Sequence, residues 1–170
     1  MKKLCIVLAL LALLAICLTG CGLNVPKPEV KSGEFDFSVT YEVNGEVKTV
    51  SGVYVCEYAG VDWALDSGYH RDWNGSVKDN AVSEDYVVGT TEDGGTIMLY
   101  FGFNPDYFMG EDVAGSMEAP KPYLVVTYPM DEFGGVEFIQ EADVIETSYG
   151  AKVVSYAYDA PVENTFGLFK

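Results

Sequence analysis

The sequence predicts an all-β domain, an antiparallel β-sandwich of about seven or eight strands. Three observations support this prediction. Residues 35–43 alternate between apolar and polar side chains, which is typical of a half-buried strand. Short runs rich in β-branched and aromatic residues recur along the rest of the chain, and glycine-containing turns separate most of them. No stretch of helical length shows a sustained 3.6-residue apolar period. An immunoglobulin-like strand order is one form of such a sandwich, and a small closed barrel is the alternative.

The first two strands are predicted as a hairpin over residues 35–58. The apolar positions of its first strand are Phe35, Phe37, Val39, Tyr41 and Val43. Asn44-Gly45 follows directly, and this dipeptide between two strand-like runs is a strong hairpin signal because both central residues must adopt positive φ.

Six further strands are predicted along the rest of the chain, at 85–89, 96–103, 123–128, 136–140, 143–147 and 151–158. Residues 142–147 are also compatible with a short helix. Two insertions, 59–84 and 104–122, break the regular spacing and are predicted as long loops. Long loops in a compact domain are often functional, so these two are the first places to look for a site.

The N-terminus has the layout of an export signal. Lys2 and Lys3 precede an apolar run, Leu4 to Leu18, which is shorter than the ~20 residues that a membrane-spanning helix needs. The sequence that follows, Leu18-Thr19-Gly20-Cys21, resembles the lipobox of bacterial prolipoproteins. This resemblance implies that a diacylglyceryl group is attached to the Cys21 thiol and that the chain is cut before Cys21.

The expected organisation is therefore a signal peptide over 1–20, the lipidated cysteine with a short tether over 21–34, and a single β domain over 35–170. The expected location is extracytoplasmic, with the protein anchored to the bacterial cell membrane by its lipid. The dozen residues after Cys21 span at most about 40 Å, so the domain is expected to work close to the membrane surface.

The charge of the chain excludes nucleic acid as a partner. Removal of Lys2 and Lys3 leaves 8 of the 10 basic residues against 26 acidic residues, a formal charge of −18. Proteins bind polyanions through Lys and Arg contacts, which this chain almost lacks. The same charge opposes contact with anionic lipid, so the membrane is expected as a partner only through the lipid anchor.

The cysteines leave no pair for an intramolecular disulfide. Cys5 and Cys17 lie in the signal peptide and Cys21 carries lipid, so Cys56 remains alone among the four cysteines. Cys56 lies inside a strand-like run, where the role of a small buried hydrophobe is expected.

The insertion at 59–84 holds the candidate ligand-binding residues, which are Trp63, Tyr69, His70, Arg71 and Trp73. Indole rings can stack on a ligand while a guanidinium binds an anionic group. The alternative is a structural loop whose aromatic rings fill the sandwich and whose Arg71 pairs with local carboxylates. The binding hypothesis requires at least one exposed indole near Arg71, whereas the structural alternative buries both.

No cofactor is expected apart from the covalent lipid on Cys21, and no catalytic residue is predicted. Asp72, Asn74 and Asp79 supply oxygen ligands for a weak calcium candidate, although the glycine spacing does not match an EF-hand. A single histidine and no Gly-x-Ser-x-Gly motif argue against a serine hydrolase.

The leading functional hypothesis is a non-enzymatic domain that binds a protein, peptide or glycan at the cell envelope. One alternative is a small-molecule-binding barrel, which would enclose a cavity. Another is a carboxylate-dependent hydrolase, because two carboxyl groups at a suitable separation suffice for glycoside hydrolysis.

Overall fold

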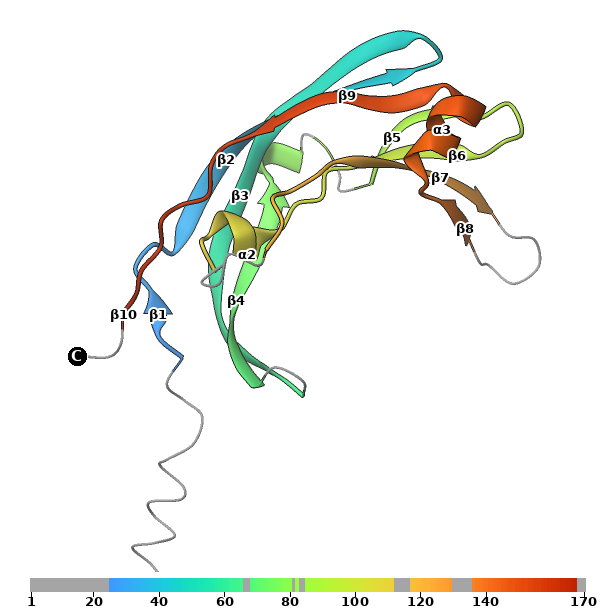
Figure 1. The fold of residues 1–170 in the computed structure, drawn as a ribbon. Coiled ribbons are helices and arrows are strands. Elements are labelled where there is room, and N and C mark those ends of the chain that lie inside the picture. Colours follow the sequence, from blue (N-terminus) through green and yellow to red (C-terminus); the bar gives the residue numbers. More distant parts are fainter. Residues whose placement is uncertain are drawn as a thin grey trace, which may run out of the picture.

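The computed structural model describes residues 25–65, 68–80, 82, 85–111, 117–129 and 136–167, so the predicted signal peptide and Cys21 lie outside the described residues. Two four-stranded antiparallel sheets pack on each other (Figure 1). The first sheet has the order β4-β3-β2-β9, and the second has the order β5-β6-β7-β8. The predicted all-β sandwich is confirmed.

The first sheet contains β2 (Ser32–Val43), β3 (Glu46–Ala64), β4 (Gly68–Val77) and β9 (Ala151–Tyr158). The second contains β5 (Asp85–Thr90), β6 (Thr96–Tyr100), β7 (Tyr123–Pro129) and β8 (Val136–Ile139). The short strands are β1 (Lys27–Pro28) and β10 (Phe166–Gly167), and the helices are the 3₁₀ turn η1 (Lys78–Asn80), α2 (Pro105–Phe108) and α3 (Ala142–Tyr149). No described strand belongs to both large sheets, so the sandwich, and not the closed barrel, is the fold. The second sheet is a meander of consecutive strands, which differs from the immunoglobulin order.

The predicted first hairpin forms as β2 and β3. Asn44 and Gly45 connect the two strands with φ values of 53° and 78°, as the dipeptide predicts. The five apolar residues of β2 identified from the alternation are all buried. They pack against apolar residues of the second sheet, for example Phe37 against Phe101 with ring centroids 5.2 Å apart. The alternation therefore gives the correct core face. Cys56 on β3 belongs to the same core and is fully buried, which confirms the expected environment of this thiol.

Helix α2 covers part of the first sheet and positions the segment that follows it. The Asn104 side chain caps this helix by accepting hydrogen bonds from the backbone N–H groups of Asp106 and Tyr107, at 3.0 and 3.3 Å. Phe108 is fully buried against Phe35, with ring centroids 4.7 Å apart. Gly110 then turns the chain with a φ of 72°, where a Cβ would lie 2.6 Å from the Val162 carbonyl oxygen. Only glycine fits this close approach.

Two predicted elements are wrong. The region 59–84, predicted as a long loop, contains the end of β3 and all of β4, which form an extended hairpin. Its Asp, Asn and Gly residues conceal the strand pattern, and a register shift between Tyr58 and Gly60 breaks the alternation. Residues 143–147, predicted as a strand, lie in α3, as the helical alternative expected. Gly150 ends this helix with a left-handed φ of 59°.

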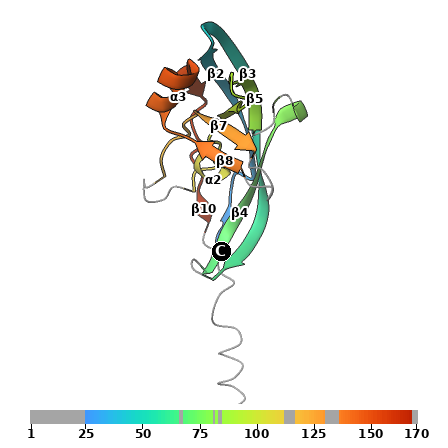
Figure 2. The ribbon, with the colours of Figure 1, turned by 90° about the vertical axis from the view of Figure 1, so that its right-hand side faces the viewer.

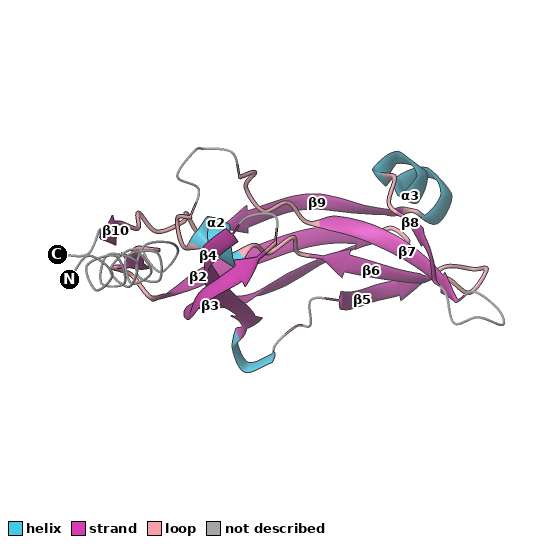
Figure 3. Ribbon diagram, turned by 90° about the horizontal axis from the view of Figure 1, so that it is seen from below, coloured by secondary structure: helices cyan, strands magenta, loops and turns pink. Residues whose placement is uncertain are grey.

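The described part of the predicted tether is held against the domain. Within 21–34, β1 pairs with β10 near the other end of the chain, and β2 already begins at Ser32. This pairing joins residues about 140 positions apart, so no local pattern indicates it. The predicted tether is therefore paired with the fold from Lys27 onward. Figure 3 shows β10 at one end of the elongated molecule and α3 at the other. Among the described residues, no helix has the length and apolar composition needed to cross a membrane.

Candidate functional site

All five predicted ligand-binding residues lie on the β3–β4 hairpin. In its register, Trp63 lies opposite Tyr69, Val61 opposite Arg71, and Tyr58 opposite Trp73. Residues directly opposite each other point to the same face of a sheet, so these pairs share the face that continues the buried side of the first sheet. His70 occupies the alternate position, and its Nδ1 lies 3.3 Å from the Gly68 carbonyl oxygen.

Arg71 and Trp73 lie at the base of this hairpin, where they join separate parts of the chain. The Nε and Nη2 groups of Arg71 donate to the two carboxylate oxygens of Glu111, and Trp73 Nε1 donates to the same carboxylate at 2.9 Å. Nη1 of Arg71 donates to the Pro26 carbonyl oxygen at 3.0 Å. The guanidinium carbon lies 3.8 Å from the centroid of the Phe166 ring. We call this set of five residues the Arg71 junction.

The Arg71 junction leaves little of the guanidinium for a ligand. Glu111 already balances its charge, and the side chains of Arg71 and Glu111 are each only 12% exposed. Trp73 is 5% exposed and packs edge-on against Tyr58. For Arg71 and Trp73 the geometry therefore favours the structural alternative.

At the far end of the same hairpin, the apolar side chains are exposed. Trp63 is 54% exposed, Tyr69 is 46% exposed and Val61 is 42% exposed, while Leu65 in the connecting turn is 90% exposed. We call these four residues the tip cluster. A contiguous exposed apolar group of this kind is typical of an interaction site. One indole is thus buried and one is exposed, which divides the predicted site into a structural base and an accessible tip.

An open pocket of about 450 Å³ lies beside the Arg71 junction. Its lining includes Val25, Tyr69, Asp106 and Glu111. Burial raises the pKa of Asp106, and the nearby charge of Glu111 raises it further. Both Glu111 oxygens accept hydrogen bonds within the junction, so Glu111 is poorly placed to act as a free base or nucleophile beside Asp106.

The calcium candidate is not assembled. Asp72 and Asn74 lie in the extended strand β4, while Asp79 lies beyond its end. The stretch from Asp72 to Val77 at the end of β4 alone spans about 16 Å, whereas calcium ligands must lie within about 2.6 Å of one ion. Among the described residues, no group of three His, Cys, Asp or Glu side chains could hold a metal ion.

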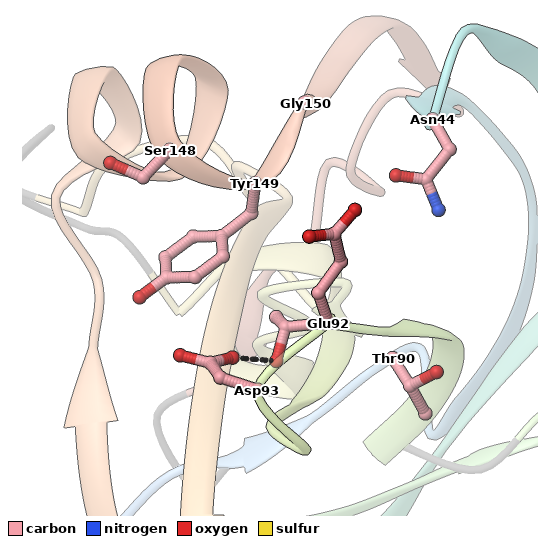
Figure 4. Close-up of a pocket in the computed structure, with 8 residues that line it drawn as sticks. Asn44, Thr90, Glu92, Asp93, Ser148, Tyr149 and Gly150 are labelled. Atoms are coloured by element: carbon pink, nitrogen blue, oxygen red, sulfur yellow. Dashed lines mark hydrogen bonds between the residues drawn. The ribbon is translucent and has the colours of Figure 1, made fainter.

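Figure 4 shows another open pocket, of about 460 Å³, formed by the β2–β3 turn, the β5–β6 turn and the end of α3. Its polar groups bind one another. The Asp93 carboxylate accepts hydrogen bonds from the hydroxyl groups of Thr91 and Tyr128, and these bonds lower its pKa. The Tyr128 hydroxyl also lies 3.1 Å from that of Tyr149. This network connects the β5–β6 turn to β7 and to the end of α3.

The outer face of the second sheet is apolar, which the sequence analysis missed. The strand register places six apolar or aromatic residues on it, which are Val87, Met98, Tyr100, Tyr123, Val125 and Phe138, and the same face also carries Thr96 and Thr127. We call the six apolar or aromatic residues the outer sheet face. Tyr100 and Tyr123 stack with centroids 5.4 Å apart. Val125 is only 1% exposed, so the accessible part of this face is formed by Val87, Tyr123 and Phe138, which are 57%, 43% and 56% exposed. The signal was present in 96–101 and 123–126, where nearly every residue is apolar, because such runs indicate a strand with two apolar faces.

Comparisons of the chain with protein-family models, with curated proteins and with solved structures gave no match.

Proposed function

We propose that this chain is an extracytoplasmic lipoprotein, anchored to the cell membrane by lipid on Cys21, whose all-β domain binds a protein or peptide of the cell envelope. The lipobox-like sequence before Cys21 supports the anchor. The outer sheet face supports the binding role, and it is the observation that carries the proposal.

The two sheets differ in the chemistry of their outer faces. On the first sheet, the outer positions of β2 and β3 include Ser38 opposite Ser51 and Thr40 opposite Thr49. The valines of this face, Val47, Val53 and Val55, each lie opposite a carboxylate residue, so the face is more polar than that of the second sheet. The corresponding positions of the second sheet carry stacked tyrosines and exposed Val87 and Phe138. Exposed apolar side chains do not stabilise a face that stays in water. They add to binding affinity when a partner covers them.

The chemistry of the outer sheet face favours a protein or peptide. Tyrosine and phenylalanine add large contact areas at a small cost in side-chain entropy. The formal charge of −18 for residues 21–170 favours a neutral or basic partner over an acidic one. The second sheet also lies away from β1 and β10, where the chain enters and leaves the fold (Figure 1), so a partner has room beside an anchored domain.

The two alternatives receive less support. A small-molecule barrel would enclose a cavity, whereas the two sheets here pack directly through a shared core. A carboxylate-dependent hydrolase would need two free carboxyl groups facing a substrate, and the pair beside the Arg71 junction has Glu111 engaged.

Photo-crosslinking in intact cells tests the binding role. A photoreactive residue is introduced in place of Val87 or Phe138 in the full-length chain, with Thr49 and Ser51 on the polar face as matched control positions. We expect discrete adducts from the outer sheet face alone, sensitive to protease. Adducts that only a glycan-degrading enzyme removes would show that the partner is a glycan and not a protein. The same weak labelling from both faces would contradict the proposal.

A further inference from the structure

The tip cluster has the composition of a surface that enters a membrane interface. Trp and Tyr are enriched at the boundary between lipid and water, because their rings are apolar and each retains a polar group. Trp63 and Tyr69 lie opposite each other near the end of the hairpin, and Leu65 at its turn is 90% exposed. Moving the apolar surface of each of these side chains out of water lowers the free energy of the protein.

The hairpin end lies where the chain enters the domain. Arg71, three residues from the start of β4, binds the Pro26 carbonyl oxygen, and Val25 and Tyr69 line the same pocket. Figure 2 shows the end of the β3–β4 hairpin and β10 at the same end of the molecule. A lipid attached upstream of Pro26 would therefore hold this end toward the bilayer.

The tether from Cys21 to Pro26 is short enough to keep the end of the β3–β4 hairpin close to the anchor. Four residues lie between Cys21 and Pro26, and the five Cα–Cα steps that join them span at most about 18 Å when fully extended. On the hairpin, the three residues from Arg71 to Gly68 extend about 10 Å toward the tip. Starting from one shared point, the tether reaches at most about 18 Å and the hairpin strand about 10 Å, so the short tether keeps the tip within reach of the surface.

We infer that the tip cluster is a second membrane contact, which inserts its aromatic and aliphatic side chains into the interfacial region beside the lipid of Cys21. This inference rests on the proposed anchor, because a domain of formal charge −18 is not drawn to a lipid surface by itself. The anchor supplies the attachment, and the tip cluster orients the domain so that the second sheet points away from the bilayer.

Fluorescence quenching in vesicles tests the inference. The lipidated mature protein is reconstituted into phosphatidylcholine vesicles whose acyl chains carry bromine, which quenches tryptophan on contact. Trp63 and Trp73 are the only two tryptophans of the chain, and Trp73 is buried. The variant Trp63→Phe therefore supplies the baseline. Leu65→Asp tests the tip, and Val47→Asp is the matched control, because Val47 is an equally apolar exposed residue on the β2–β3 hairpin.

Flotation of the vesicles separates the two claims. We expect wild type and all variants to float, with bromine quenching strong in wild type and Val47→Asp but reduced to near the Trp63→Phe baseline in Leu65→Asp. If the proteins float and wild type is quenched no more than Trp63→Phe, the tip contact is wrong and the anchor stands. If wild type does not float, the anchor fails and the inference fails with it.

Discussion

Arg71 on β4 and Glu111 beyond α2 are 40 residues apart in the chain, yet their side chains pair through two hydrogen bonds at the base of the β3–β4 hairpin. The same guanidinium binds Pro26 at the start of the domain and covers the Phe166 ring near its end. A single side chain thus joins the two ends of the described chain to the hairpin that carries the tip cluster.

The Arg71–Glu111 pair is expected to contribute substantially to stability. Because both side chains are mostly buried, Arg71→Ala leaves the Glu111 carboxylate without its partner, and we expect a loss of about 3 kcal/mol in the free energy of unfolding. Urea unfolding measures the loss. Lys78→Ala is the control, since the Lys78–Glu34 pair is exposed and its charges are screened by water, so its loss should change stability much less. Equal effects of the two variants would contradict the structural role of Arg71.

The two tryptophans should respond differently to truncation. Trp73→Ala removes a buried indole and its hydrogen bond to Glu111, so we expect a loss of about 3–5 kcal/mol. Trp63→Ala should lower stability clearly less than Trp73→Ala, because about half of this side chain is already exposed in the folded state. Chemical unfolding of both variants checks the difference. A large loss in Trp63→Ala would mean that the tip is part of the core.

Cys56 should be unreactive in the folded domain. Burial raises the pKa of its thiol to about 12, so the thiolate that reacts with thiol reagents is almost absent at pH 8. In a Cys21→Ser chain without its signal peptide, a chromogenic disulfide reagent should label Cys56 only after denaturant is added, and reducing agent should leave the melting temperature unchanged. Rapid labelling of the native protein would show that the thiol is accessible.

Deprotonation of Asp106 should lower the free energy of unfolding as the pH rises. Burial and the neighbouring Glu111 hold its pKa above the ordinary value of 3.8, so between these two pKa values the folded state binds more protons than the unfolded state. Stability contributed by the protonated form is therefore lost as the pH rises through this window, and it is constant above the folded pKa. Asp106→Asn should gain stability relative to wild type from pH 3.5 to pH 7.

Urea unfolding of wild type and Asp106→Asn across this pH range gives the comparison. Asp36→Asn, at an exposed position of β2, controls for the removal of one negative charge. A constant difference between wild type and Asp106→Asn at every pH would be inconsistent with the raised pKa.

Local patterns predict most of the fold. The alternation through β2 and the Asn44-Gly45 turn identify the first hairpin and its buried face, because both depend on neighbouring residues alone. The strand at Ala151–Tyr158 has the predicted bounds. By contrast, the sequence predicts a loop at β4 because its Asp, Asn and Gly residues have low strand propensity, and its long pairing with β3 overrides that propensity.

The candidate site depends on contacts between distant segments. The sequence identified Arg71 and both tryptophans as notable, but nothing local indicates that Glu111 lies beside Arg71 and Trp73. Trp73 is buried because it packs against Tyr58 and donates to Glu111 beyond α2, whereas Trp63 lies farther along the hairpin and is half exposed. The outer sheet face could have been recognised from the two continuous apolar runs of β6 and β7.

Metabolic labelling with a palmitate analogue tests the central claim, the lipid anchor at Cys21, most directly. The full-length chain should incorporate the label and fractionate with membranes, whereas Cys21→Ser should remain unlabelled, because the lipobox-like sequence offers no other cysteine at its end. Cys56→Ser, which removes the buried thiol of the domain, should be labelled like wild type. Incorporation of label into Cys21→Ser, or a wild-type chain that carries no label, would contradict the account.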